Sequence, residues 1–256
     1  MKLMRQALLI VCFLTIGSTA FAQGSTDTAR LFLAIKEMQD VFMKKSLSFD
    51  VHYTYTSELQ PGIILDSLSG HMDLSEGRYH YNISNTEMIA NERYVITLFK
   101  EDKIMYLSKP SGTPQADPGQ QVLQVLKTMG ISRCSVDESG SAKAIRINFN
   151  SGSPYKEIRL LFDKKSGYLS EMQYVVKTQL LIQATDEQEQ VTEKYGEFAV
   201  VSCIYSGYAP FVPHPDMFDE HTYFTKEDKG YRALGTYSDF NVFLGSEDMV
   251  SERHDN

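Results

Sequence analysis

Apolar side chains near the beginning of the chain recur with the period of an amphipathic helix. Leu31, Ile35, Met38 and Phe42 are spaced by three or four residues, and charged side chains stand among the positions between them. This spacing places the four on one side of a helix. The threonine at position 26 or the aspartate at position 27 is suited to cap it. The pattern predicts one helix of about four turns with a single apolar face.

A period of two follows the predicted helix directly. Phe49, Val51, Tyr53 and Tyr55 alternate with polar residues, as in a strand with one apolar and one polar face. Short polar turns at 99–104 and 163–167 are typical of hairpins between antiparallel neighbours. We expect further strands over residues 67–74, 79–83, 94–99, 104–108, 144–149, 157–162, 169–177 and 198–205, and two more over 221–224 and 240–243.

The remaining segments complete the predicted architecture. Residues 95–99 and 104–107 are apolar at almost every position, so we expect the sheet to be covered on both faces there. A shorter helix is predicted over 120–129, and the polar stretches 110–118 and 183–193 are expected to be a loop and a solvated connection. This order of elements predicts an α+β fold with one extended antiparallel sheet and helices across one face.

The first 22 residues have the order of a secretory signal peptide. Lys2 and Arg5 precede an apolar run over 7–16, and Ala20-Phe21-Ala22 forms a small-x-small cleavage site. The run is too short for a permanent membrane anchor, and no later segment is long and apolar enough to be one. We therefore expect a product exported across the membrane, with a single domain from residue 23 to residue 256.

Charge and cysteine content narrow the function classes. The net charge is −8, and it becomes −10 when Lys2 and Arg5 are removed with the signal, which argues against a nucleic-acid partner. Outside the signal only Cys134 and Cys203 remain. An oxidising compartment would allow them to form a disulfide, and the alternative is two separate buried thiols.

The mature sequence lacks a recognisable catalytic motif. Residues 138–141, Glu-Ser-Gly-Ser, do not have the pattern of a nucleophilic serine elbow, and no glycine-rich phosphate loop precedes a helix. The best metal candidate is the loop from His214 to His221, but two histidines seven residues apart across prolines do not specify a zinc site. We expect no catalytic residue, no metal and no cofactor.

What remains is an apolar sheet surface rich in aromatic residues. If the helices fill the concave side of the sheet, the side chains on this surface form an ordinary core, which is the usual role of aromatic stripes. If the sheet curves enough to leave a gap, the same side chains line a cavity suited to an acyl chain. The residue pattern leaves both interpretations open.

Several stretches resemble the periplasmic lipoprotein carrier family, the LolA and LolB group. They are the first helix leading into Phe49–Tyr55, Ser69-Gly70 followed by Arg78-Tyr79-His80-Tyr81, the segment 99–106, and 158–174 across its hairpin turn, and they cover roughly residues 28–174. The resemblance implies a curved, incomplete half-barrel of antiparallel strands with helices packed across its concave face. The region from about residue 185 would be a C-terminal extension.

The resemblance also implies a function without covalent chemistry. The protein would be a non-enzymatic periplasmic carrier or chaperone that shields a lipid or lipoprotein acyl chain, with a membrane-associated donor or acceptor protein as a further partner. The alternative is a periplasmic adaptor or sensor that binds protein through the same sheet. The residues expected to bind the acyl chain are Leu31, Ile35, Met38, Phe42, Phe49, Val51, Tyr53, Tyr79, Tyr81, Ile83, Tyr106 and Ile147.

Overall fold

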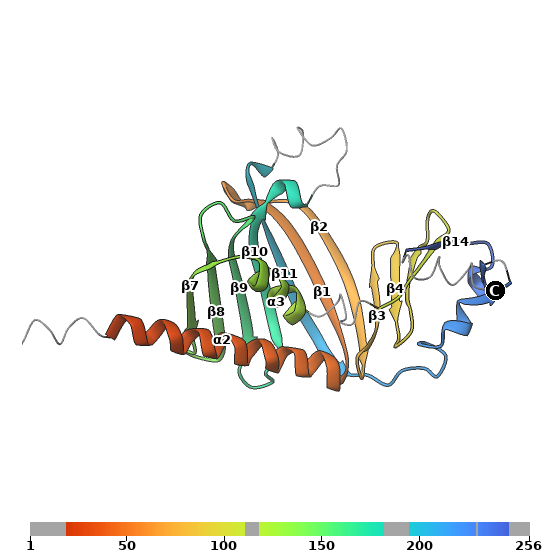
Figure 1. The fold of residues 1–256 in the computed structure, drawn as a ribbon, viewed down its shortest axis with the longest axis horizontal. Helices are drawn as coiled ribbons and strands as arrows, with labels where there is room; N and C mark the ends of the chain where they lie inside the picture. Colours follow the sequence, from red (N-terminus) through yellow and green to blue (C-terminus); the bar gives the residue numbers. More distant parts are fainter. Residues whose placement is uncertain (1–18, 111–117, 182–194, 229, 246–256) are drawn as a thin grey trace, which may run out of the picture.

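One large curved sheet dominates the computed structural model, which describes residues 19–110, 118–181, 195–228 and 230–245 (Figure 1). In this part of the chain twelve strands form the sheet, in the order β14-β6-β5-β4-β3-β2-β1-β11-β10-β9-β8-β7. Neighbours are antiparallel except β14 and β6, which are parallel. No described pairing joins β14 to β7, so the sheet is open, and the expected α+β fold class is confirmed.

The chain order of the elements follows the sequence prediction closely. The bounds are α2 (Thr19–Lys44), β1 (Ser46–Ser57), β2 (Gln60–Ser75), β3 (Arg78–Ile83), β4 (Thr86–Ala90), β5 (Val95–Phe99), β6 (Ile104–Ser108), α3 (Pro118–Thr128), β7 (Ile131–Asp137), β8 (Ala142–Phe149), β9 (Tyr155–Asp163), β10 (Leu169–Lys177), η1 (Thr178–Leu180), β11 (Phe198–Pro210), η2 (Glu220–Thr222), β12 (Phe224–Glu227), β13 (Gly230–Ala233), η3 (Gly235–Tyr237) and β14 (Asn241–Leu244).

The helix α2 buries the predicted apolar stripe against the concave side of the sheet. Leu31, Ile35, Met38 and Phe42 are all buried and belong to one core cluster with residues of β1, β8, β9, β10 and β11. The expected cap at position 26 or 27 is wrong, because the helix begins at Thr19 and runs through Asp27. The Asp27 carboxylate instead lies 3.7 Å from the guanidinium of Arg30, one turn later.

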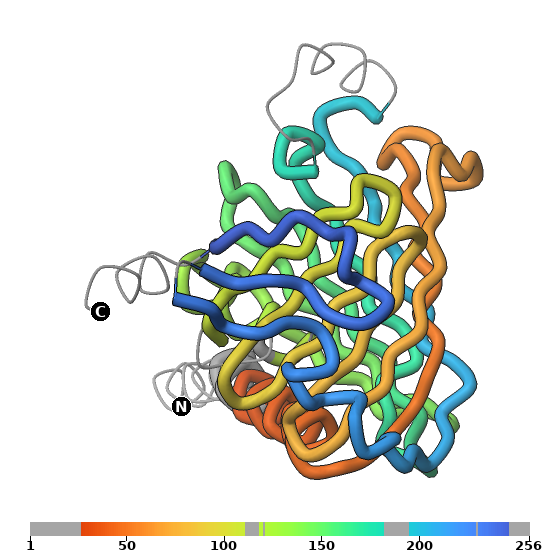
Figure 2. The backbone as a smooth tube through the Cα atoms, turned by 90° about the vertical axis from the view of Figure 1, so that its right-hand side faces the viewer, coloured from red at the N-terminus to blue at the C-terminus, as the bar shows by residue number. Residues whose placement is uncertain are grey.

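A second core lies on the outer side of β4, β5 and β6. Ile96, Leu98 and Met105 pack there against Phe218 and Phe224 of the C-terminal segment. Figure 2 shows this segment, in blue, lying over the yellow strands. On the concave side the expected cover is present at Val95, which is buried in the first core, but absent at the end of β5 and in the middle of β6.

The uncovered side chains on that side are two aromatic residues near the β14 edge of the sheet. Phe99 is 39% exposed and Tyr106 is 42% exposed. In Figure 1, α2 runs from β7 past β11 and ends near β1 and β2, so the helices do not reach this edge.

Several strands differ from the prediction, and local turn chemistry accounts for two of these differences. The strands β4, β7 and β13 were not expected; β4 is only five residues long and follows a tight turn in which Ser84 has a φ of 49°. The strand expected over 221–224 is wrong, because η2 occupies Glu220–Thr222. The Asp219 side chain accepts a hydrogen bond from the His221 N–H and begins that turn. The predictions for residues 111–117 and 183–193 lie outside the described residues.

The part of the chain after residue 185 contributes to the centre of the sheet as well as to its periphery. The strand β11 lies between β1 and β10, in the middle of the strand order. The layer that covers the second core begins only beyond Pro210, where β11 ends.

The predicted disulfide between Cys134 and Cys203 is wrong, because both thiols are free. Cys203 lies on β11 and Cys134 on β7, four strands further along the sheet. Neighbouring strands are about 4.8 Å apart, whereas a disulfide needs Cα atoms within about 7 Å. Burial raises the pKa of the Cys203 thiol to about 12, and burial and the nearby Asp27 raise that of Cys134 to about 11.

Replacing Leu31 by alanine should destabilise the fold strongly, because its side chain is fully buried at 0% exposure. The expected loss is about 2–4 kcal/mol, the usual cost of a cavity left by a buried leucine. Leu33 on the same helix is 57% exposed, so Leu33→Ala is the matched control and should cost less than about 1 kcal/mol. Urea unfolding measures both, and equal losses would contradict the placement of the α2 stripe.

Candidate ligand cavity

A cavity of about 260 Å³ lies between the concave side of the sheet and the two helices. Strands β1, β2, β3, β4, β10 and β11 supply most of its wall, and α2 and α3 close it. Figure 1 shows α3 inside the curve of the sheet, above α2. The lining residues are Phe42, Phe49, Val51, Tyr53, Met72, Tyr81, Met88, Pro118, Gln121, Met172, Tyr174 and Tyr205.

One row of side chains across four strands forms much of the wall. Phe49 is opposite Met72, Met72 is opposite Tyr81, and Tyr81 is opposite Met88. Directly opposed residues of antiparallel strands share a face, so the row presents alternating aromatic and thioether groups to the cavity. Methionine side chains are flexible and polarisable, which lets such a wall adapt to ligands of different shape.

The polar groups of the lining are neutral. No residue among those that line the cavity carries a formal charge, and the side-chain donors are Gln121 and four tyrosines. The Tyr81 hydroxyl donates to the Tyr53 hydroxyl at 3.2 Å. Burial raises the pKa of Tyr53 and of Tyr174, so both hydroxyls stay protonated. The cavity therefore suits an apolar chain that ends in a neutral oxygen acceptor.

The twelve predicted ligand residues divide into three groups. Phe42, Phe49, Val51, Tyr53 and Tyr81 line the cavity. Leu31, Ile35, Met38, Tyr79 and Ile147 lie in the same core cluster but do not line it.

The third group, Ile83 and Tyr106, lies outside both the lining and that cluster. Tyr106 continues the cross-strand row from Met88 through Thr97, but it lies beyond the reach of the helices. Whether any of the twelve binds a ligand stays a prediction.

Seven lining residues were absent from the prediction. Met72, Met172, Tyr174 and Tyr205 stand on strands that the period-two pattern identified, and their alternation with polar neighbours was the available signal. Met88 lies on the unexpected strand β4. Pro118 and Gln121 depend on where α3 docks, which no local pattern in the sequence specifies.

A second hollow of about 250 Å³ lies next to the cavity, between α3 and strands β9 and β10. Gln121, Met172 and Tyr174 line both spaces. Val122 of α3 is buried and also lines the second hollow. The two small spaces therefore adjoin each other between α3 and the same stretch of β10.

The outer face of the same strands carries a partly buried polar network. His80, on β3, belongs to this network, and its side chain is only 13% exposed. Its Nδ1 lies 3.3 Å from Asp73 Oδ2, and its Nε2 lies 2.8 Å from Glu87 Oε1. Lys100 pairs with the other oxygen of Glu87 at 3.0 Å. His71 lies 3.3 Å from Asp73 and is half exposed.

The network shifts the pKa of two of its members. Burial opposes the charged form of His80, but hydrogen bonds to Glu87 and Asp73 outweigh burial and raise its pKa above the ordinary 6.5. Burial likewise opposes ionisation of Glu87, but hydrogen bonds to His80 and Lys100 lower its pKa below 4.5. At a pH between the pKa of Glu87 and the pKa of His80, both groups carry their charges and form an ion pair.

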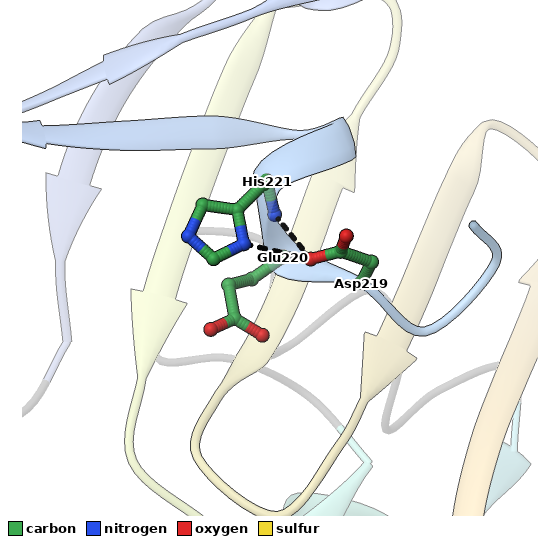
Figure 3. A group of neighbouring side chains, drawn as sticks. All are labelled: Asp219, Glu220 and His221. Atoms are coloured by element: carbon green, nitrogen blue, oxygen red, sulfur yellow. Dashed lines mark hydrogen bonds and ion pairs between the residues drawn. The ribbon is translucent and has the colours of Figure 1, made fainter.

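The charged side chains of the loop that contains the metal candidate are paired with one another or with neighbouring residues. Asp219, Glu220 and His221 bring one ligand atom each within 4.8 Å of one another. Figure 3 shows the bonds between Asp219 and His221, and the Nδ1 of His221 lies 2.8 Å from Asp219 Oδ1. Glu220 pairs with Arg93 and accepts from Asn91 at 2.7 Å. These contacts explain the cluster as a structural one, so it does not support a metal site.

The raised pKa of His80 predicts a loss of stability as the pH rises. A group whose pKa is higher in the folded state stabilises the fold below its unfolded pKa, and the contribution disappears as the pH rises through the folded value. A glutamine at position 80 cannot take up the proton. His80→Gln should therefore lower the free energy of unfolding by on the order of 1 kcal/mol at about pH 6 but by much less at about pH 9.

Urea unfolding at the two pH values measures this difference. His214→Gln, on a loop where the side chain is 75% exposed, is the control and should change stability little at either pH. A loss for His80→Gln that does not depend on pH would contradict the charged pair.

The structure is similar to several solved structures at low sequence identity. A conserved protein from Thermus thermophilus is 7% identical with a TM-score of 0.43, over 83% of this chain and 98% of that one. A LolA superfamily protein from Nitrosomonas europaea is 10% identical with a TM-score of 0.33, over 74% and 97%. A putative outer membrane lipoprotein-sorting protein domain from Vibrio parahaemolyticus is 8% identical with a TM-score of 0.31, over 74% and 96%.

Comparisons of the sequence alone found no counterpart. No family model matches it. No curated protein matches it either. None of the described helices is both long and apolar enough to cross a membrane. The similar structures include a member of the superfamily that the sequence resembles. A function for this chain has to be argued from its own cavity.

Proposed function

We propose that this protein is exported to the periplasm and carries or shields an acyl chain of a lipid or lipoprotein in the cavity beneath α3. The observation that carries the proposal is a partly open cavity lined by apolar and neutral side chains on the concave face. The signal-like residues Lys2, Arg5 and Ala20–Ala22 support export. The partners would be the lipid or acylated lipoprotein and a membrane-associated donor or acceptor protein.

The size of the cavity suits part of one chain. Ligand pockets usually measure about 300–1,000 Å³, and the space of about 260 Å³ is slightly smaller. Each buried methylene contributes about 0.8 kcal/mol, so about eight methylenes supply about 6 kcal/mol before the costs of association. A longer chain needs more room, and displacement of α3 would join the cavity to the neighbouring hollow.

The lining favours binding over catalysis. Nucleophilic catalysis needs a nucleophile held by an adjacent base, and the lining offers neither a histidine nor a carboxylate. The Tyr53 hydroxyl accepts from Tyr81, so its own proton can be donated to an ester or amide carbonyl at the end of the acyl chain. The protein would therefore release its cargo unchanged.

An adaptor or sensor role is the second candidate, and exposed apolar side chains favour it. Leu59 is 81% exposed at the turn between β1 and β2, and Leu180 of η1 is 55% exposed at the same end of the sheet. Backbone bonds from Glu58 to Phe198 and from Thr178 to Glu197 hold these segments together. If native mass spectrometry finds no co-purified lipid and no fluorescent fatty acid binds, this second role is favoured.

Filling the cavity should abolish uptake of a fluorescent fatty acid. Val51 lines the cavity, and Val51→Phe would occupy space that the chain needs, so we expect at least a tenfold loss of affinity, about 1.4 kcal/mol. Val212 is 88% exposed, and Val212→Phe is the matched control with unchanged binding. Fluorescence titration measures both variants, and thermal unfolding verifies that they fold. Undiminished uptake by a folded Val51→Phe protein would rule out this cavity as the binding site.

A further inference from the structure

The strand β2 extends well beyond its neighbour β3. It spans Gln60–Ser75, but β3 pairs only with the part from Gly70 to Ser75. Within the described residues, no strand pairs with β2 from Asp66 to Ser69 on the side away from β1. Figure 1 shows β3 beside only the lower part of β2. The sheet therefore has an open edge in its middle, next to Gly70.

Backbone groups of β2 face this open side. The Ser67 N–H indicates this, because it donates to Oδ1 of its neighbour Asp66 at 2.7 Å. Backbone groups along a strand point alternately to its two sides, so Ser69 faces the same way as Ser67. Both residues are exposed. An unpaired edge of this kind is a template for one more strand.

The open edge and the cavity meet at Gly70. A Cβ atom there would lie 2.9 Å from the ring of Tyr81 and 2.8 Å from the Asn82 carbonyl oxygen, so only glycine allows the ring to lie this close. Tyr81 lines the cavity and its hydroxyl bonds to Tyr53. The end of the paired region is thus also part of the cavity wall.

Strand alternation connects the two features. Leu68 is opposite Tyr53, so it lies on the concave face, whereas Ser67 and Ser69 lie on the outer face. In a strand added to this edge, the residue opposite Leu68 would also point to the concave face, with Leu68 between it and Tyr53. An acyl chain on that side chain would reach the lining residue Tyr53 by passing across Leu68.

We propose that the edge of β2 from Asp66 to Ser69 binds, by strand addition, the extended peptide that follows the acylated residue of a lipoprotein. This inference rests on the proposed function and specifies the cargo as a lipoprotein and not a free lipid. Strand addition needs only backbone groups from the ligand, so it tolerates many sequences. The exposed carboxylate of Asp66 disfavours pairing between two copies of this edge.

The test compares two ligands on the wild-type protein. One is a diacylglyceryl cysteine that carries about ten residues of neutral peptide, and the other is the same diacylglyceryl cysteine without the peptide. We expect the peptide to raise affinity about tenfold. A version of the peptide with N-methylated backbone amides should lose this gain, because it cannot form the strand hydrogen bonds.

Two variants localise the effect. Ser67→Pro removes the N–H on the open side, so it should abolish the gain in affinity from the peptide but keep the affinity for the peptide-free ligand. Ser67→Ala keeps this N–H and should keep the gain. Thermal unfolding verifies both variants, and the N-methylated peptide on wild-type protein decides the outcome if Ser67→Pro does not fold. Equal affinity for the two ligands, or a gain that N-methylation leaves intact, would overturn strand addition alone. Failure of the wild-type protein to bind either ligand would overturn the proposed function as well.

Discussion

The packing of the apolar stripe of α2 against the concave side of the sheet is the constraint on which the rest of the structure depends. A curved sheet has an apolar hollow that must be shielded from water, and α2 shields one part of it with side chains that are almost fully buried. The helix crosses the ends of the strands and does not fill the hollow. The remaining space is closed by α3, and the cavity exists because these two helices cover different regions.

The two faces of the central strands have different chemistry because their side chains alternate. On the concave face, Met72 and Tyr81 form an uncharged wall. On the outer face of the same strands, Asp73 and His80 belong to a network of ionised groups. On both β2 and β3, one residue thus lines the uncharged cavity while the residue next to it belongs to the charged network. A shift of strand register by one residue would place the charged side chains in the cavity and the apolar ones on the outer face.

Period and turn chemistry made most of the architecture predictable. The stripe from Leu31 to Phe42 and the alternation from Phe49 to Tyr55 are local patterns, and the structure contains both as predicted. The open, curved sheet was expected only through the family resemblance. Local patterns do not specify which strands become neighbours, and for this reason the disulfide prediction was wrong.

Tertiary packing decided what sequence reasoning missed at the site. Gln121 reaches the cavity only because α3 docks inside the curve of the sheet, and Met88 lies on a five-residue strand too short for a clear period. Conversely, Tyr106 has the right residue type and face, but the helices end before they reach it. Residue type and alternation identified the apolar concave face of the sheet. The extent of the helices over that face determined which of its residues line the cavity.

The central place of β11 has a consequence for how the chain acquires its structure. Val51 of β1 is paired with Tyr205 of β11, so the two halves of the sheet are joined by a contact between residues far apart in the sequence. Such a contact forms slowly because a long loop must close first. During synthesis the early strands therefore lack their central neighbour until most of the polypeptide has been made. A chain with this topology completes its fold late, which is compatible with passage through a translocation channel before folding.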